Sequence, residues 1–161
     1  MIFLGLGTNL YNKRKNLDNV LSLFQSSEKI EILSKSKIYK TSPMENKNQD
    51  YFLNMVINIK TTLKPFELLT YIKSIEIKMG RKVLKNKYMP RIIDIDILAY
   101  KGKIFKNKIL TIPHPKAKLR KFVLKPWNDI APNFILPNEN KSINLLLESI
   151  SNLEDSVIEF K

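Results

Sequence analysis

Apolar residues in the first half of the chain follow strand-like and helix-like spacings in turn. Ile2, Leu4 and Leu6 occupy alternate positions, which is typical of a strand with one buried face. Spacings of three and four then predict a helix over 17–24, and a second helix begins at Pro65 and ends before Gly80. The predicted elements are, in order, strand 2–6, helix 17–24, strand 30–39, strand 52–60, helix 65–79 and strand 92–100.

This order of elements predicts an α+β fold with a ferredoxin-like βαββαβ core. In such a core two helices cover one face of an antiparallel sheet, and we expect the other face to be open. The sequence then predicts C-terminal additions, namely a short strand over 109–112, a helical turn or two over 118–124 and a capped helix over 142–150. Because no repeat, low-complexity tract or Gly/Ser linker interrupts the chain, we expect one domain over residues 1–161.

The composition excludes several kinds of site. The 161 residues include no Cys and one His, which rules out disulfides, thiolate metal sites and sites with two His ligands. A metal ion would therefore be held mainly by oxygen. No apolar run approaches the roughly 20 residues of a membrane span, and no basic segment precedes the first apolar stretch. We expect a soluble, cytoplasmic protein with no membrane partner, and a monomer.

The net charge of +13 is compatible with nucleic-acid binding, because a basic surface attracts phosphates of any sequence. However, most of the basic residues are Lys, in a chain that is also rich in Asn and Ile, and all three residue types have A/T-rich codons. Dispersed Lys residues can simply solvate the surface. Arg makes planar, bidentate contacts to phosphate that Lys does not reproduce, so the few Arg residues are more informative: Arg14, Arg81, Arg91 and Arg120.

Asp94 and Asp96 are the strongest candidates for a metal site. They lie two residues apart in a predicted strand, so their side chains face the same way while Ile95 faces the opposite layer. Carboxylates about 6.6 Å apart along a strand can share two Mg²⁺ ions that lie about 3.5 to 4 Å apart. Mg²⁺ typically binds one or two carboxylates together with water and substrate phosphates. The alternative is an amphipathic strand with a hydrated face, because so short a motif often arises by chance.

Cationic residues flank this acidic pair in the sequence. They are Arg81, Lys82, Lys85, Lys87 and Arg91 before it, and His114, Lys116, Lys118, Arg120 and Lys121 after it. A polyphosphate bridged by Mg²⁺ needs this combination, with carboxylates for the metal ions and Arg or protonated His for the free oxygens. The alternatives are a solvated Lys-rich loop and a purely structural His in a rigid turn. The sequence contains no glycine-rich phosphate-binding motif.

Two aromatic residues and an amide could bind a flat heterocycle. Phe52 and Asn54 face the same side of a predicted strand, and Phe122 lies two residues after Arg120. A pterin or a purine could stack between two aromatic rings while an amide side chain binds its polar edge. Each of these residues could instead belong to the core.

With these residues in view, the chain resembles the family of 6-hydroxymethyl-7,8-dihydropterin pyrophosphokinases along nearly its whole length. The resemblance rests on five segments in the family's order, which are 5–10, 39–44, 51–54, 80–81 with 90–97, and 110–122. The last two segments are the most specific, because they contain the acidic pair and the single His. The family's ferredoxin-like fold agrees with the predicted order of elements.

The resemblance implies an enzyme of the folate pathway that transfers pyrophosphate from ATP to the hydroxymethyl group of the pterin and releases AMP. Two Mg²⁺ ions would be bound by Asp94 and Asp96. The implied catalytic residues are Asp94, Asp96, Arg81, Arg91, His114 and Arg120. The implied ATP-binding residues, which include the lid residue Tyr88, are Glu76, Tyr88, Arg91, Ile97, Thr111, His114 and Arg120. The implied pterin-binding residues are Thr41, Ser42, Pro43, Met44, Phe52, Asn54 and Phe122.

Some positions depart from the family's usual pattern, namely Lys73, Val83, Tyr88 with Met89, and Ile109. They concern the lid and the adenine contacts, whereas the acidic pair is intact, so we expect an active enzyme. The alternative from another class is an RNA-binding ferredoxin-like domain, which stacks bases on an open sheet. The aromatic signature of such domains is absent from the sequence, and two aligned carboxylates would repel phosphate without Mg²⁺. We therefore expect pterin and ATP as small-molecule substrates, and no nucleic acid.

Overall fold

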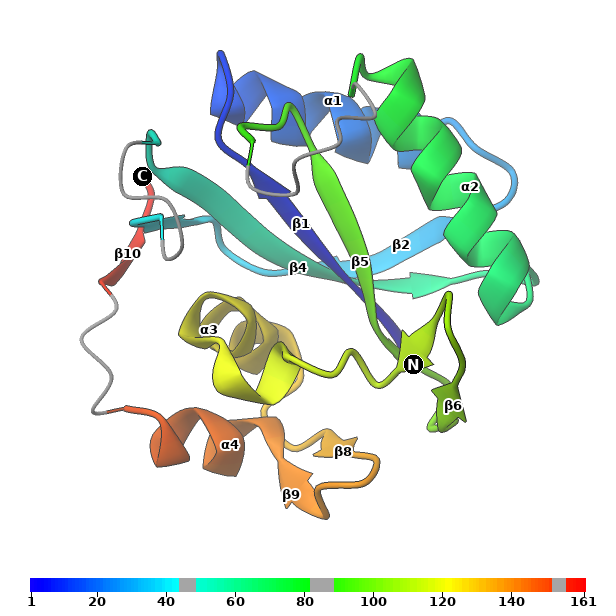
Figure 1. Ribbon diagram of the computed structural model, residues 1–161, viewed down its shortest axis with the longest axis vertical. Coiled ribbons are helices and arrows are strands. Elements are labelled where there is room, and N and C mark those ends of the chain that lie inside the picture. Colours follow the sequence, from blue (N-terminus) through cyan, green and yellow to red (C-terminus); the bar gives the residue numbers. More distant parts are fainter. Residues whose placement is uncertain (44–48, 82–88, 152–155) are drawn as a thin grey trace.

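The core of the fold is an antiparallel sheet whose central strands carry the apolar alternation of the sequence (Figure 1). The computed structural model describes residues 1–43, 49–81, 89–151 and 156–161. The strand order is β10-β3-β4-β1-β5, and β2 also pairs with β4. The strands are β1 (Ile2–Thr8), β2 (Glu31–Lys35), β3 (Tyr39–Thr41), β4 (Phe52–Lys60), β5 (Asp94–Tyr100) and β10 (Val157–Glu159). The predicted order of elements is observed over the first 100 residues, with one predicted strand divided.

Two helices, α1 (Lys13–Gln25) and α2 (Pro65–Lys78), pack on one face of the sheet (Figure 1). Gly80 follows α2 with a φ of 93°, a conformation that glycine adopts without strain, so the predicted end of this helix is confirmed. In the predicted apolar stripe of α1, Leu17, Val20 and Phe24 are fully buried in the core, and Leu21 is partly buried against it. This face therefore forms as the sequence predicts.

The predicted strand over 30–39 is divided in the structure into β2 and β3. Ser36 lies at the division and stays bonded to β4 through both its main chain and its side chain. Its amide donates to the Val56 carbonyl at 2.9 Å, and its hydroxyl oxygen accepts from the Val56 amide at 2.9 Å. Because the hydroxyl replaces a main-chain partner, the chain bends here without leaving the buried amide of Val56 unpaired.

The opposite face is partly covered by α3 (Lys121–Ile130), against which α4 (Ile143–Ser149) packs (Figure 1), so the expectation of an open face is wrong. The helix near residue 121 is longer than predicted because its buried stripe continues to Trp127. Trp127 packs on Phe3 of β1, with their ring centroids 5.1 Å apart. This apolar contact covers part of the sheet face on which an RNA-binding domain of this class would stack bases.

Short elements complete the chain, namely β6 (Phe105–Lys106) with β7 (Thr111–Ile112), β8 (Ile135–Leu136) with β9 (Lys141–Ser142), and a 3₁₀ turn over Ala117–Leu119. Ser142 caps α4 as predicted, because its hydroxyl oxygen accepts from the Leu145 amide at 3.3 Å. The last strand, β10, pairs with β3. Within the described ranges, every helix is too short or too polar to cross a bilayer.

Candidate functional site

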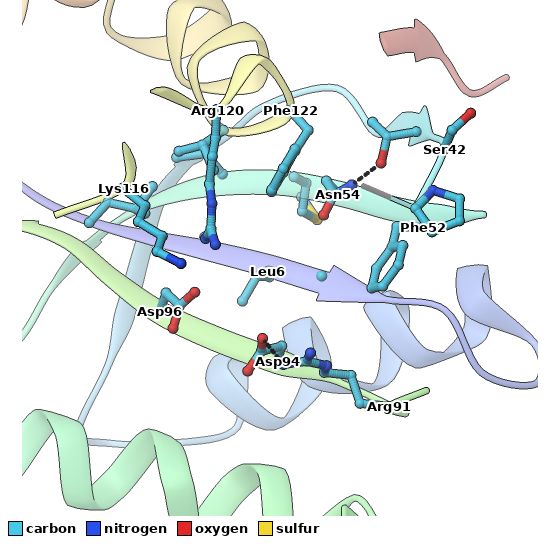
Figure 2. Close-up of a pocket in the computed structure, with 18 of the residues that line it drawn as sticks. Leu6, Ser42, Phe52, Asn54, Arg91, Asp94, Asp96, Lys116, Arg120 and Phe122 are labelled. Atoms are coloured by element: carbon cyan, nitrogen blue, oxygen red, sulfur yellow. Dashed lines mark hydrogen bonds and ion pairs between the residues drawn. The ribbon is translucent and has the colours of Figure 1, made fainter. Parts of the chain in front are cut away.

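A pocket of about 480 Å³ lies on the face of the sheet that α3 partly covers (Figure 2). Strands β1, β4 and β5 form its floor, and residues around the start of α3 form the facing wall. The pocket brings together a set of residues that the sequence predicts for the site: Thr41, Ser42, Pro43, Phe52, Asn54, Arg91, Asp94, Asp96, Arg120 and Phe122. Two further predicted residues, Met44 and Tyr88, lie outside the described residues.

Asp94 and Asp96 both line the pocket from β5, while Ile95 between them is fully buried in the core. The predicted alternation is therefore confirmed. On the neighbouring strand β1, Gly7 is paired with Asp94 and Gly5 with Asp96. Because glycine has no side chain, β1 leaves the space beside both carboxylates free. Sequence reasoning assigned these two glycines no place in the pocket, which both of them line.

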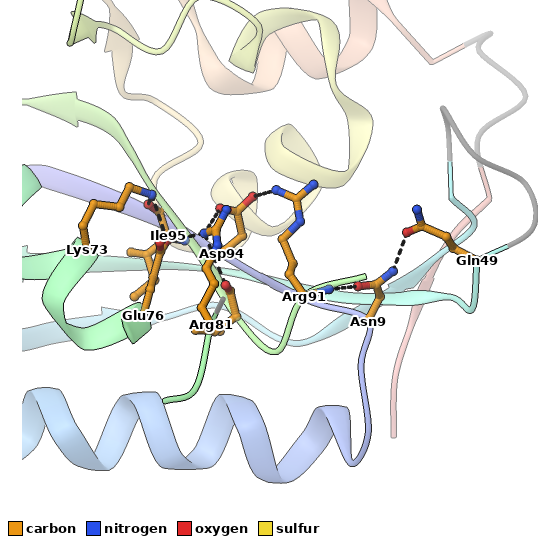
Figure 3. Close-up of polar contacts among 9 residues, drawn as sticks. Asn9, Gln49, Lys73, Glu76, Arg81, Arg91, Asp94 and Ile95 are labelled. Atoms are coloured by element: carbon orange, nitrogen blue, oxygen red, sulfur yellow. Dashed lines mark hydrogen bonds and ion pairs between the residues drawn. The ribbon is translucent and has the colours of Figure 1, made fainter. Parts of the chain in front are cut away.

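Two guanidinium groups bind the Asp94 carboxylate, one on each oxygen (Figure 3). Arg81 Nη1 lies 2.5 Å from Oδ1, and Arg91 Nη1 lies 2.6 Å from Oδ2. Burial raises the pKa of Asp94, but the charges of Arg91 and Arg81 outweigh this effect and hold the pKa below its usual value. The ion pairs among the described residues do not include Asp96. The two acids of the motif therefore differ in their electrostatic surroundings.

Glu76 lies in α2 at the outer edge of β5, and it is not among the residues that line the pocket. Its buried carboxylate accepts from Lys73 Nζ at 2.8 Å, from the Ile95 amide at 2.7 Å and from Arg81 Nη1 at 2.7 Å (Figure 3). Burial raises the pKa of Glu76, and the nearby Lys73 and Arg81 lower it in part. The structure thus places Glu76 behind the acidic pair, where it binds Arg81.

The other two residues predicted only for the ATP site also lie away from the pocket lining. Ile97 is buried in the core on the helix-covered face, and Thr111 belongs to the short strand β7. Arg81 does not line the pocket either, but it reaches the site through its ion pair with Asp94. Within the described residues, the pocket lining therefore includes a larger share of the residues predicted for pterin binding than of those predicted for ATP binding.

His114 lies in the turn after β7, close to the pocket but outside its lining. Its amide donates to the Leu98 carbonyl at 3.0 Å, which fixes the turn to β5. Its Nδ1 accepts from the Lys116 amide at 3.2 Å, so the neutral ring carries its proton on Nε2. Burial lowers the pKa of His114, Arg120 lowers it further, and the charge of Asp96 opposes both effects. The ring is therefore available as a neutral hydrogen-bond donor.

Arg120 and Lys116 point from the α3 side of the pocket toward Asp96 (Figure 2). Lys116 was predicted only as part of a basic flank, and the structure adds it to the pocket. The Arg120 guanidinium carbon lies 5.5 Å from the centroid of the Phe122 ring. This wall therefore carries positive charge next to an aromatic surface.

The aromatic end of the pocket contains Phe52 from β4 and Phe122 from α3, with Asn54 between them in the view of Figure 2. The Asn54 side chain is buried and donates from Nδ2 to the Thr41 hydroxyl oxygen at 2.8 Å. A flat ring between Phe52 and Phe122 would meet the amide of Asn54 at its edge. The structure brings together all three residues that the sequence predicts for heterocycle binding.

Asn9 connects two segments that border the pocket (Figure 3). Its Nδ2 donates to Gln49 Oε1 at 2.8 Å, and its Oδ1 accepts from the Arg91 amide at 2.8 Å. The Asn9 amide also donates to the Arg91 carbonyl at 3.2 Å. Asn9 lies in the first segment of the family resemblance, but sequence reasoning assigned it no role, because its partners are distant in the chain.

The pocket offers oxygen ligands for a metal ion from one strand. In the part of the chain that the structure describes, no three His, Asp or Glu side chains gather as they do in a metal site made by protein alone. The carboxylates of Asp94 and Asp96 line one wall beside the space left by two glycines. This donor set fits a hard cation that completes its coordination with substrate phosphates and water.

Comparison with protein families gives one family for most of the chain. The model of the 7,8-dihydro-6-hydroxymethylpterin-pyrophosphokinase (HPPK) family matches residues 3–132. The 2-amino-4-hydroxy-6-hydroxymethyldihydropteridine pyrophosphokinase of Methylorubrum extorquens is 36% identical over 98% of this chain and 96% of its own length. The enzyme of that name from Aquifex aeolicus is 38% identical over 88% of this chain and 87% of its own length.

Some relatives are much longer. The folic acid synthesis protein FOL1 of Dictyostelium discoideum is 42% identical over 94% of this chain, which spans 23% of that protein. Among solved structures, a Plasmodium falciparum HPPK-DHPS aligns with a TM-score of 0.72 over 92% of this chain and 45% of its own. Its sequence identity is 20%, so it shows a shared fold.

Proposed function

The chain belongs to the 7,8-dihydro-6-hydroxymethylpterin-pyrophosphokinase family, and we propose that it transfers the terminal pyrophosphoryl group of ATP to the hydroxymethyl oxygen of 6-hydroxymethyl-7,8-dihydropterin, releasing AMP. The family is one of pyrophosphokinases that act in folate biosynthesis. The observation that carries the proposal is the pocket itself, because an aromatic end with a buried amide lies beside two aligned carboxylates flanked by Arg. One end suits a heterocycle and the other suits a polyphosphate.

At the aromatic end, the pterin ring stacks between Phe52 and Phe122, and its polar edge binds the side chain of Asn54. Stacking on an aromatic ring favours a flat heterocycle beyond the burial of area alone. Thr41, Ser42 and Pro43 also line the pocket and complete the ring's surroundings. This arrangement points the hydroxymethyl group toward the acidic pair.

At the charged end, Asp94 and Asp96 would hold two Mg²⁺ ions, and bound Mg²⁺ would supply neutralisation of the triphosphate charge and a lower pKa of the acceptor hydroxyl. Arg91 and Arg120 bind phosphate oxygens, since guanidinium and phosphate match in geometry. The Nε2 proton of His114 donates to another phosphate oxygen. Asp96, which forms no ion pair with a described residue, is the candidate acceptor for the hydroxyl proton.

The reaction is an in-line displacement at the β-phosphorus. A bond forms between the hydroxymethyl oxygen and the β-phosphorus, the bond from that phosphorus to the bridging oxygen of the α-phosphate breaks, and AMP leaves. Phosphoryl transfer requires mainly positioning and charge stabilisation from a protein. Positioning of two bound reactants alone can supply about 7 to 11 kcal/mol of the barrier.

The ferredoxin-like assignment of the core is part of the same proposal. The element order from β1 to β5, with β1 between β4 and β5, supports it. Glu76, Ile97 and Thr111 stay assigned to the ATP site, as the family resemblance implies.

A direct test mixes the protein with MgATP and the hydroxymethyl-dihydropterin and follows the products by phosphorus NMR. We expect AMP and the pterin pyrophosphate in equal amounts. The Asp94→Ala variant should lose at least about 100-fold in kcat while remaining folded, because the residue faces the pocket. Asp18→Ala, which removes an exposed acid paired with Arg14 on α1, is the matched control. Absence of AMP together with salt-sensitive binding of short RNAs would instead support the RNA-binding alternative.

A further inference from the structure

The carboxylate of Asp94 is occupied on both oxygens by protein groups (Figure 3). Arg81 binds Oδ1 and Arg91 binds Oδ2, each through Nη1. All three side chains are about three-quarters buried, with exposed fractions of 26% for Asp94, 25% for Arg81 and 24% for Arg91. Charge-assisted bonds in such a partly desolvated place are roughly twice as strong as neutral ones. A cation that approaches Asp94 therefore meets two competing cations.

The two arginines are themselves held in place. Arg81 also binds Glu76 Oε2 at 2.7 Å, and Glu76 is fixed in α2 by its bonds to Lys73 and to the Ile95 amide. The main chain of Arg91 is bonded on both its amide and its carbonyl to Asn9. The guanidinium groups are therefore positioned at Asp94 by two separate parts of the fold.

We propose that Arg81 and Arg91 are exchangeable counter-ions of Asp94, which make metal binding at this acid conditional on a bound triphosphate. Without a triphosphate, both guanidinium groups occupy the carboxylate and weaken its binding of a divalent cation. A triphosphate in the pocket offers these groups other anionic oxygens and frees Asp94 for the metal. The proposal rests on the proposed function, since it takes the charged end of the pocket as the triphosphate site.

The exchange conserves ionic contacts. Arg binds phosphate and carboxylate oxygens in the same fork geometry, so each guanidinium can replace one anion by another at little cost. Mg²⁺ gives up its water reluctantly and usually adds substrate phosphates to one or two carboxylates. By thermodynamic reciprocity, if the triphosphate strengthens metal binding, the metal strengthens triphosphate binding by the same factor. The result is a site that binds the metal ion and the triphosphate cooperatively.

Binding of Mn²⁺, followed by electron paramagnetic resonance on the full chain without nucleotide, tests the proposal. Mn²⁺ replaces Mg²⁺ at oxygen ligands and its free form gives a measurable signal. Arg81→Gln and Arg91→Gln should each bind Mn²⁺ about tenfold more tightly than the wild type, because a competing counter-ion is lost. Lys116→Gln removes the same charge from the same pocket without touching Asp94, and it should tighten binding less than about twofold.

The same titration with a non-hydrolysable ATP analogue separates this proposal from the proposed function. The analogue should tighten Mn²⁺ binding strongly in the wild type and much less in Arg81→Gln. The counter-ion exchange is wrong, and the proposed function stands, if two results are found together. The analogue tightens Mn²⁺ binding in the wild type, and without nucleotide both Arg variants bind Mn²⁺ with the same affinity as the wild type. If Mn²⁺ fails to bind even with the analogue, the metal assignment and the exchange both fail. Unchanged circular dichroism in each variant verifies folding.

Discussion

The Nδ2 atom of Asn54 donates to the hydroxyl oxygen of Thr41 at 2.8 Å, and both side chains are buried at the aromatic end of the pocket. This bond fixes the orientation of the amide. The Oδ1 atom of Asn54 lies next to Gly7, where an added Cβ atom would be 3.0 Å from it. The pocket therefore presents a defined hydrogen-bonding group, the amide of Asn54. Its orientation depends on Thr41 in β3 and on the absence of a side chain at Gly7 in β1.

Thr41→Val should weaken pterin binding, because it removes the acceptor of Asn54 Nδ2 at nearly constant volume. Leaving a buried donor unpaired costs about 1 to 3 kcal/mol. We expect the KM for the pterin to rise about tenfold with a smaller change in the KM for ATP, measured by steady-state kinetics. Thr61→Val is the matched control, because Thr61 is also buried and donates to the Lys29 carbonyl at 2.7 Å, away from the pocket. Equal pterin KM values in the two variants would refute the role of Thr41.

Gly7→Ala should also reduce pterin affinity. The new methyl group would lie 3.0 Å from Asn54 Oδ1, so the amide must move from its position. Gly5→Ala is the comparison, because its methyl group would meet Leu98 Cδ2 at 3.3 Å, and a Leu side chain can adjust. Isothermal titration with the pterin should show a larger loss for Gly7→Ala. The prediction fails if the Gly5 variant loses as much.

The sequence predicts the acidic pair well because strand alternation is a local property. Asp94 and Asp96 face one pocket since residues two apart always share a face, and the same rule aligns Phe52 with Asn54. The pairing of these strands with one another follows from the order of elements. These parts of the site depend on residues that are near in sequence.

The sequence does not predict individual side-chain contacts between distant residues. The ion pair of Arg81 with Asp94 and the bond of Asn9 to Gln49 depend on how loops meet, and no periodicity encodes this. The coverage of the second face was missed for a related reason. Trp127 packs on Phe3 of β1, whose side chain lies on the sheet face opposite to α1 and α2. The two residues of this contact are far apart in the chain.

We expect the hydrogen bond between Tyr39 and Asp129 of α3 to make the free energy of unfolding depend on pH in the alkaline range. The Tyr39 hydroxyl donates to Asp129 at 2.9 Å, and burial and this bond raise its pKa well above the usual 10.0. A raised pKa in the folded state gives stability that is present below pH 10.0 and is lost as the pH rises above it. Tyr39→Phe should therefore be less stable by about 1 kcal/mol at neutral pH, and it should lose less stability than the wild type at higher pH.

Urea unfolding at several pH values between neutrality and the alkaline range measures this difference. Tyr11→Phe, which removes an exposed phenol, is the control and should follow the wild type at every pH. Because all other titrating groups are shared, the difference between the wild type and Tyr39→Phe isolates one residue. Parallel curves for these two proteins would contradict the assignment.

Asn9→Ala should reduce catalysis more than it reduces stability, because Asn9 joins the segment of Gln49 to that of Arg91. Loss of its side chain removes the hydrogen bonds at 2.8 Å to both segments. The pterin end and the phosphate end of the pocket are then no longer held at a fixed position relative to each other. Small displacements of reacting groups cost large factors in rate, and we expect kcat/KM to fall on the order of 100-fold for both substrates.

Asn16→Ala provides the control for this variant. Asn16 is equally buried near the start of α1, and its Nδ2 donates to Thr8 Oγ1 at 3.1 Å and to the Leu10 carbonyl at 2.8 Å, but neither partner lines the pocket. Both variants should lose about 1 to 3 kcal/mol of unfolding free energy in urea. Only the Asn9 variant should lose activity, because only its bonds reach the two segments that hold the reactants. A similar loss of kcat/KM in both variants would mean that Asn9 acts through stability alone.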